Sequence, residues 1–468
     1  MSQTRSNTTV TVPVAAKDRY DVIVIGGGVS GSIAGIAAAR HGARTLAIEQ
    51  HGFMGGSLTA MGVGPMMSFH NSAGRQLIRG LPEDLVERLA AHDASPGHIP
   101  DSITYCSTVT PFESEQLKIE LETMLEEAGG SVLYHARLAH PVCQKGRIRS
   151  VIFCCSSGLI RYDATVFVDA TGDAELAYRS GVPCVTGRVS DGAVQPMTMN
   201  LKVGNVDTDA VRRYVERHPG DFHFTFGAEE GLARLKRTPR ISLAGFLDEW
   251  EAAKKSGEID IPRDLVLFFE TATPGVVIVN TSRIQGLDPT DPADISRAET
   301  IGRRQCMSIF RFLKRRCTGF EHAINLGTSA HIGVRESRHI RGLYVLTADD
   351  LVEERHFEDP VALGGYPIDI HSPDKDETVS THLRADGAYQ IPMRSLLVGS
   401  PSNLIVVGRA ISATHEASAA FRVTPIAMAI GQAGGTLAAL AARDSIDPER
   451  YRYEKLREAL EKDGALLP

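Results

Sequence analysis

The sequence is poor in the residues that mark several specialised classes of protein. Its 468 residues include one tryptophan and seven cysteines, and no two cysteines form a Cys-x-x-Cys pair. A disulfide-rich secreted scaffold is therefore excluded, and we expect reduced thiols in a reducing compartment. Apolar residues make up 43% and charged residues 23%, which excludes a disordered chain and is typical of a large folded protein.

Basic charge is not in excess, and the first residues carry no hydrophobic leader. Fifty lysines and arginines stand against 57 acidic residues, a net charge of -7, which disfavours a nucleic-acid partner. The first 19 residues are polar and threonine-rich, without the apolar core of a signal peptide. We therefore expect a cytoplasmic protein.

One uncharged run, residues 423–442, is long enough to cross a bilayer. It is rich in alanine and glycine, contains Gln432, and has Pro425 near its start. This composition favours a buried core helix, and we predict no membrane partner.

The order of the expected elements predicts an α/β fold. A buried strand at 20–25, a helix at 29–41 and a strand at 44–49 form a βαβ unit, and a short strand at 404–407 returns to this pattern. We predict a discontinuous, Rossmann-like nucleotide-binding domain from residues 19–200 and 391–445. An α+β substrate domain, 201–390, is inserted between its parts, with a disordered arm at 1–18 and a C-terminal helix within 446–468.

A Gly-x-Gly-x-x-Gly pattern, Gly26 to Gly31, is the strongest motif. It follows a buried strand and opens a helix, and Glu49 ends the next strand. Glycines at these positions allow a tight turn and a close approach of the backbone to a pyrophosphate, and the acidic residue can bind a ribose diol. The pattern by itself fits FAD or NAD.

Further glycines later in the chain favour FAD. Gly55-Gly56 follows Glu49, Ala170-Thr171-Gly172 follows a strand, and Gly408-Arg409 follows another strand before the helix that starts near Pro425. A simple NAD dehydrogenase needs none of these elements.

With these motifs the sequence resembles the FAD-dependent oxidoreductases of the glutathione-reductase-like, two-dinucleotide-binding-domain superfamily. The resemblance covers about residues 20–440, and it rests on seven stretches that together are highly specific for the family: 22–43, 97–125, 167–181, 194–207, 332–342, 366–374 and 408–435. It implies that FAD contacts Gly26, Gly28, Ser30, Gly31, Glu49, Gly55, Gly56, Ser57, Leu138, Ala170, Thr171, Gly172, Gly408, Arg409, Val423 and Thr424. Many relatives have aspartate where Arg409 stands, so the resemblance assigns Arg409 no definite role.

The helix that follows Arg422 has a function of its own in this resemblance. Thr424 is the expected N-cap and Pro425 fits the first turn. In the superfamily the N-terminus of this helix points at the flavin, where it stabilises the negative charge of the reduced ring. Arg422 would add a full positive charge; a plain surface arginine is the alternative.

Three more polar residues in glycine-rich or apolar surroundings are candidates for catalysis. His70 and His415 are possible bases, and Arg335, three residues before Arg338, is expected to share a helix face with it and to bind a carboxylate. A structural role is the alternative for each of the three. Arg283 is a further candidate for anion binding. No metal site is expected, because the spacing around His371 matches no metal pattern.

The predicted function is an FAD-dependent oxidoreductase of the dehydrogenase or oxidase type. Hydride would pass between the flavin and a small organic substrate, with a carboxylate as one option. A flavin monooxygenase is the alternative, ranked second because Gly408-Arg409 replaces the Gly-Asp typical of that class. A tRNA-modifying or a non-catalytic flavoprotein is less favoured. The electron acceptor and the oligomeric state stay open.

Overall fold

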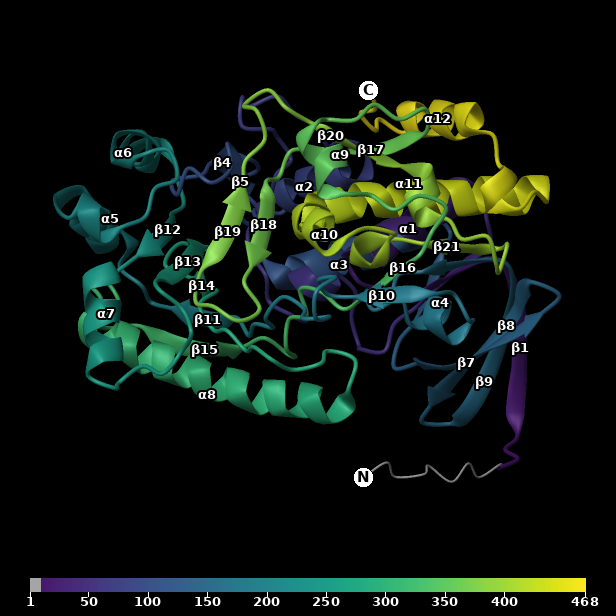
Figure 1. Ribbon diagram of the computed structural model, residues 1–468, viewed down its shortest axis with the longest axis horizontal. Helices are drawn as coiled ribbons and strands as arrows, with labels where there is room; N and C mark the ends of the chain where they lie inside the picture. Colours follow the sequence, from purple (N-terminus) through teal and green to yellow (C-terminus); the bar gives the residue numbers. More distant parts are fainter. Residues whose placement is uncertain (1–9) are drawn as a thin grey trace.

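The computed structural model describes residues 10–468 (Figure 1), and its buried hydrophobic residues form two large cores and two smaller clusters. A seven-stranded sheet and the helices around it form the first core, and a five-stranded antiparallel sheet with its helices forms the second. The mixed α/β fold with a parallel, Rossmann-like sheet centre is the predicted one.

The first sheet has a parallel centre and an antiparallel extension. Its strand order is β6-β2-β1-β9-β8-β7. Strand β21 pairs with the carboxyl end of β9, which lies between β21 and β1. The strands are β1 (Val14–Ile25), β2 (Thr45–Ile48), β6 (Ser131–Leu133), β7 (Arg137–Gln144), β8 (Arg147–Cys155), β9 (Gly158–Asp169) and β21 (Leu404–Val406). The carboxyl ends of β1, β2 and β9 lie at one edge, where the predicted cofactor motifs begin.

Strand β1 begins earlier than predicted. Val14 and Ala16 pair with Leu159 and Arg161 of β9, so residues 14–18 are strand and not part of a disordered arm. The apolar run at 20–25 marked only the buried half of this strand, because its first residues are exposed. Residues 10–13 of the predicted arm are exposed and belong to no helix or strand, and residues 1–9 lie outside the described residues.

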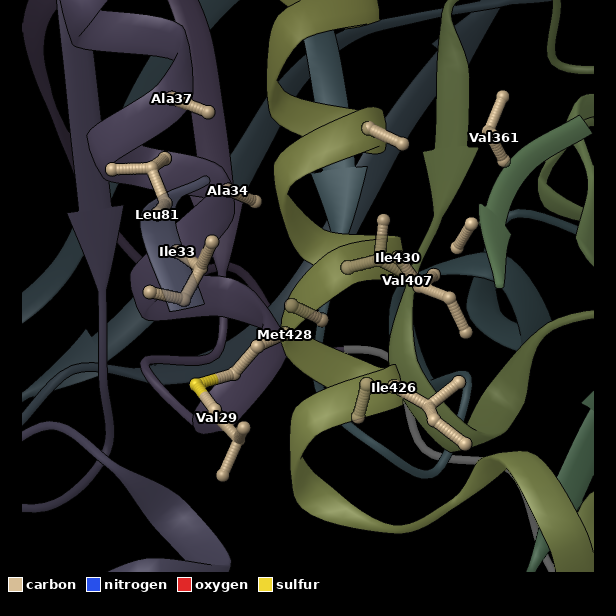
Figure 2. Packing of buried hydrophobic residues seen from close by; sticks show 14 of the residues in the cluster. Val29, Ile33, Ala34, Ala37, Leu81, Val361, Val407, Ile426, Met428 and Ile430 are labelled. Carbon is tan, nitrogen blue, oxygen red and sulfur yellow. The ribbon is translucent and has the colours of Figure 1, made fainter. Parts of the chain in front are cut away.

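A tight helix pair fills the centre of the first core (Figure 2). Helix α11 (Thr424–Asp444) packs along α1 (Val29–Arg40), with Met428 beside Val29. A Cβ atom added to Gly435 would lie 2.1 Å from the carbonyl oxygen of Ala34, so the glycine is required for this approach. The remaining helices of this core are α2 (Leu81–Ala91), α3 (Ser114–Glu127), α9 (Ala348–Val352), α10 (His415–Phe421) and α12 (Tyr453–Lys462), whereas α4 (Glu175–Arg179) packs in a smaller separate cluster.

Helix α11 is the one helix among the described residues that is long and apolar enough to cross a membrane, and 89% of its apolar window is buried inside the protein. This burial agrees with the predicted core helix.

The second core is shorter than the predicted domain 201–390. Its buried residues run from Met197 to Ile332, whereas the buried residues between Leu346 and Tyr389 belong to the first core. The sheet order is β12-β13-β14-β11-β15, from β11 (Leu201–Gly204), β12 (Ser242–Gly245), β13 (Val266–Glu270), β14 (Val277–Val279) and β15 (Ile324–Thr328). The helices are α5 (Thr208–Arg217), α6 (Ala228–Arg237), α7 (Leu247–Lys255) and α8 (Pro292–Arg316).

Short strand pairs connect the two cores. The hairpin of β18 (Ile368–His371) and β19 (Thr378–Thr381) stands between the second sheet and α10 (Figure 1). The other pairs are β3 (Met66–Met67) and β4 (Ile99–Pro100) with β5 (Thr108–Thr110), β10 (Cys184–Thr186) with β16 (Arg338–Ile340), and β17 (Pro360–Gly364) with β20 (Tyr389–Pro392). The β18–β19 hairpin forms the junction where the functional side chains gather.

Candidate functional site

The glycine motif forms an anion cradle at the start of α1. Gly26 has a φ of +99°, and an added Cβ would lie 2.5 Å from the carbonyl oxygen of Ala170. The first hydrogen bond of the helix runs from the amide of Ser32 to the carbonyl of Gly28, so the amides before Ser32 have no acceptor within the helix. Only Gly56 comes as near as 4.0 Å to a Cβ added at Gly28. Free amides with open space above Gly28 fit a pyrophosphate.

Glu49 is fixed at the end of β2 by main-chain amides. Its carboxylate accepts hydrogen bonds from the amide of Gly27 at 2.7 Å and from that of His51 at 2.9 Å. The side chain is buried and keeps lone pairs free for a ribose diol. This arrangement fits the ribose-binding role that the sequence predicts.

The second glycine pair lies directly on the first motif. The amide of Gly55 donates to the carbonyl of Gly27 at 2.8 Å, and a Cβ at Gly56 would lie 2.7 Å from Cα of Gly28. Ser57 follows in a single 3₁₀ turn. The predicted contacts 55–57 therefore border the cradle.

Of the residues expected on the adenine side, Ala170, Thr171 and Gly172 follow the carboxyl end of β9, and Leu138 lies near the start of β7. Thr171 folds over the buried carboxylate of Asp169, which accepts bonds from its amide and its hydroxyl. Burial raises the pKa of Asp169. Leu138 is buried on β7, opposite Phe153. The adenine contact that the resemblance implies for Leu138 stays a prediction.

Arg409 is paired, and its partner explains the departure from the family pattern. Its guanidinium lies 2.7 Å from the carboxylate of Asp173 and covers Gly172, whose φ is +79°. Gly408 approaches α1, because a Cβ there would lie 2.7 Å from Oγ of Ser30. Arg409 thus joins the 3₁₀ turn after β21 to the loop after β9.

Helix α11 points its free N-terminal amides at the junction. The helix begins at Thr424 with Pro425 in its first turn, as predicted, but the N-cap is Val423, and no side chain caps it. The expectation that Thr424 is the cap is wrong, because Thr424 already has helical conformation. Uncapped amides remain available to an anionic ligand, and Arg422 stands directly before them.

Arg335 does not share a helix face with Arg338. Residues 335–337 form a loop, and Arg338 begins β16 with its guanidinium 4.3 Å from the ring centre of Tyr178. Arg335 donates to the carbonyl oxygen of Pro196 at 2.6 Å. Burial, and then the charge of Arg422, lower the pKa of Arg335. The charge of Arg422 thus acts on Arg335, whereas Arg338 lies on β16 and shares no helix face with it.

The hairpin residue Asp369 is the carboxylate of this junction. Its carboxylate oxygens lie 2.9 Å from the Tyr105 hydroxyl, 3.3 Å from Nε2 of His371 and 3.5 Å from Arg422. Burial opposes its ionisation, but His371 and Arg422 outweigh this and lower its pKa. The pKa of His371 is also lowered, first by its burial and next by Arg335. The sequence motifs predict no role for Asp369 and His371, because only the fold brings these two residues close to the arginines.

His415 is bound to a buried carboxylate distant in sequence. It begins α10, and its Nδ1 lies 2.8 Å from Glu336, the residue after Arg335. Burial raises the pKa of Glu336, but His339, 3.6 Å away, and the hydrogen-bonded His415 outweigh burial and bring it to about 2. An ionised Glu336 makes Nδ1 of His415 the donor and leaves Nε2 as a proton acceptor.

His70 lies in a separate polar cluster. Its Nδ1 bonds the Thr108 hydroxyl at 2.9 Å, and its ring meets that of His98, which bonds Glu83 at 3.1 Å. Burial, and then His98, lower the pKa of His70. Within residues 10–468 no hydrogen bond joins this cluster to the arginines, so its geometry favours a structural role.

A cavity of about 280 Å³ opens between the two cores. The loop at 62–65, helix α3 and the second sheet form its walls, and Lys118 and Lys202 lie on opposite sides. Two of its lining residues, Asn200 and Ser329, carry buried side-chain oxygens without a partner in the described chain. None of the catalytic candidates lines this cavity. Separately, no group of three metal-ligating side chains is found among residues 10–468.

Comparisons with known proteins agree with the cofactor site. The family model "FAD dependent oxidoreductase" matches residues 21–460. The chain therefore belongs to this family, and it is an FAD-dependent oxidoreductase.

Individual relatives are distant. Digeranylgeranylglycerophospholipid reductase 2 of Methanothermobacter thermautotrophicus is 27% identical over 200 residues, which are 40% of this chain and about half, 51%, of the relative. A geranylgeranyl bacteriochlorophyll reductase-like structure from Thermoplasma acidophilum has a TM-score of 0.47 at 12% identity and covers 95% of this chain and 83% of its own. The p-nitrophenol 4-monooxygenase of Pseudomonas putida has a TM-score of 0.44 at 10% identity, covering 95% and 84%.

Proposed function

We propose that this enzyme is of the dehydrogenase or oxidase type and acts on a small organic substrate with a carboxylate group. The observation that carries the proposal is Arg422, which directly precedes α11 and lies 3.5 Å from the buried carboxylate of Asp369, and whose charge lowers the pKa of the buried Arg335. Guanidinium groups bind carboxylates through paired, charge-assisted hydrogen bonds.

The bound FAD would accept or return the hydride. Gly26, Gly28 and Gly31 would hold its pyrophosphate and Glu49 its ribose, while the amides of α11 would face the flavin. Arg335 and Arg422 orient the substrate carboxylate, which fixes the carbon that exchanges hydride. Nε2 of His415 accepts the proton that leaves the substrate, since Glu336 holds the ring through Nδ1.

The test compares two arginine variants in anaerobic mixing with a panel of hydroxy acids and amino acids. Arg335→Gln should raise the apparent KM for the acid that bleaches the flavin by about 10- to 100-fold, the value of one hydrogen bond to a charged group. Arg338→Gln, three residues away and stacked on Tyr178, is the matched control and should keep the parent KM. Equal behaviour of the two variants would overturn the proposal.

A further inference from the structure

Two more arginines reach the junction from the second core. Arg283 follows β14 and is only 1% exposed, and Arg263 precedes β13 at 7% exposed. Arg283 donates through Nη2 to the carbonyl oxygens of Ser372 and Glu377 in the turn of the β18–β19 hairpin. The hairpin is thus bonded by Arg283 on one side and by Arg422, at Asp369, on the other.

Each of these two guanidinium groups holds buried nitrogens that have no acceptor among residues 10–468. Nε and Nη1 of Arg283 are buried without a partner, and so is Nε of Arg263. Along residues 10–468, no hydrogen bond or ion pair engages the guanidinium of Arg263. A buried donor without an acceptor costs free energy, and a guanidinium cannot escape the cost by losing its proton.

Positive charge exceeds negative charge around the junction at the β18–β19 hairpin. The charges of Arg422, Arg263 and Arg283 all act on Arg335, and the carboxylate of Asp369 opposes them. The carboxylate of Asp264 acts on Arg263 and Arg283, and that of Asp376 acts on Arg283. Both acids are exposed, however, and Asp376 already pairs with Lys254. His371 stays neutral at neutral pH, because its pKa is lowered. One monocarboxylate would leave most of this buried charge unbalanced.

We propose that the substrate is a dicarboxylate whose two ends bind at two subsites, one from each core. Arg335 and Arg422 hold the carboxylate next to the reacting carbon, and Arg263 and Arg283 hold the distal one. This inference rests on the proposed function, and it adds that the distal carboxylate bridges the two cores. A substrate with a single acidic group would leave the buried Nε of Arg263 without an acceptor.

Calorimetric titration of the FAD-loaded enzyme tests the inference with non-reacting probes. Succinate and glutarate should bind about 100-fold more tightly than butyrate and pentanoate, which lack the second carboxylate. Methyl phosphate carries two charges on one group, so it should bind no better than butyrate. Equal affinities for succinate and butyrate, or tighter binding of methyl phosphate than of succinate, would overturn the dicarboxylate assignment.

Variants locate the second subsite. Arg263→Gln should lower the affinity for succinate by at least about tenfold more than the affinity for butyrate. Arg263→Lys should restore part of this difference in affinity. Arg338→Gln serves as control, and retained flavin content shows that each variant is folded. An Arg263→Gln variant that binds succinate like the parent contradicts the inference. If butyrate and succinate bind equally and acids still reduce the flavin, only the second subsite fails; if only uncharged compounds bind and reduce it, the proposed function fails as well.

Discussion

The carboxylate of Glu336 lies 2.8 Å from Nδ1 of His415, and both side chains are buried. Glu336 follows Arg335 in the chain, and His415 begins the short helix α10, whose C-cap is Arg422. The pair therefore ties together the two segments that carry the first two arginines of the site.

Glu336→Gln should remove a stabilising charge whose effect depends on pH. The pKa of Glu336 is about 2 in the folded protein, below its ordinary 4.5. A lowered pKa stabilises the fold above pH 4.5, and the stabilisation is lost as the pH falls toward about 2. The parent should therefore melt several degrees higher than Glu336→Gln near neutral pH, and the difference should shrink in acid. A difference in melting temperature that is constant from neutral pH into acid would contradict this.

Gly31→Ala should abolish stable FAD binding. An added Cβ would lie 1.8 Å from the carbonyl oxygen of Gly26, so the turn that forms the cradle must move. The ratio of flavin absorbance to protein absorbance in the purified variant measures the loss. Gly399→Ala is the matched control, because no atom lies within 4 Å of a Cβ there. Full flavin content in Gly31→Ala would show that the cradle is not where FAD binds.

Gly435→Ala should destabilise the protein although alanine is the better helix former. Propensity alone favours the substitution by about 1 kcal/mol. The new Cβ, however, would lie 2.1 Å from the carbonyl of Ala34, which would push α11 away from α1. We expect a lower melting temperature in a thermal scan; an increase would mean that the two helices separate at little cost.

Arg422→Gln should make the flavin harder to reduce. The arginine stands directly before the N-terminus of α11, where positive charge stabilises the reduced ring. The midpoint potential should fall by tens of millivolts, about 30 mV for each 1.4 kcal/mol of lost stabilisation in a two-electron couple. Spectroelectrochemical titration beside Arg338→Gln checks this. An unchanged potential would place the Arg422 charge away from the flavin.

The glycine motif and the order of strands and helices could be predicted from the sequence, because they depend on neighbours within about 30 residues. The arginine cluster could not be predicted from the sequence. Arg263, Arg283, Arg335 and Arg422 are far apart in the chain, and only the packing of two cores against the β18–β19 hairpin brings them together. The helix expected to pair Arg335 with Arg338 does not form, because Arg338 begins β16, which pairs with β10. The partner of His415 could not be predicted either, because Glu336 lies 79 residues away in the chain.

Anaerobic mixing of the purified enzyme with carboxylic acids, and separately with NADH and NADPH, tests the central claim most directly. The account predicts that an acid substrate bleaches the visible flavin band by itself, without nicotinamide and without oxygen. Bleaching by nicotinamide alone, with a product that forms only when oxygen is admitted, would contradict it and identify a flavin monooxygenase.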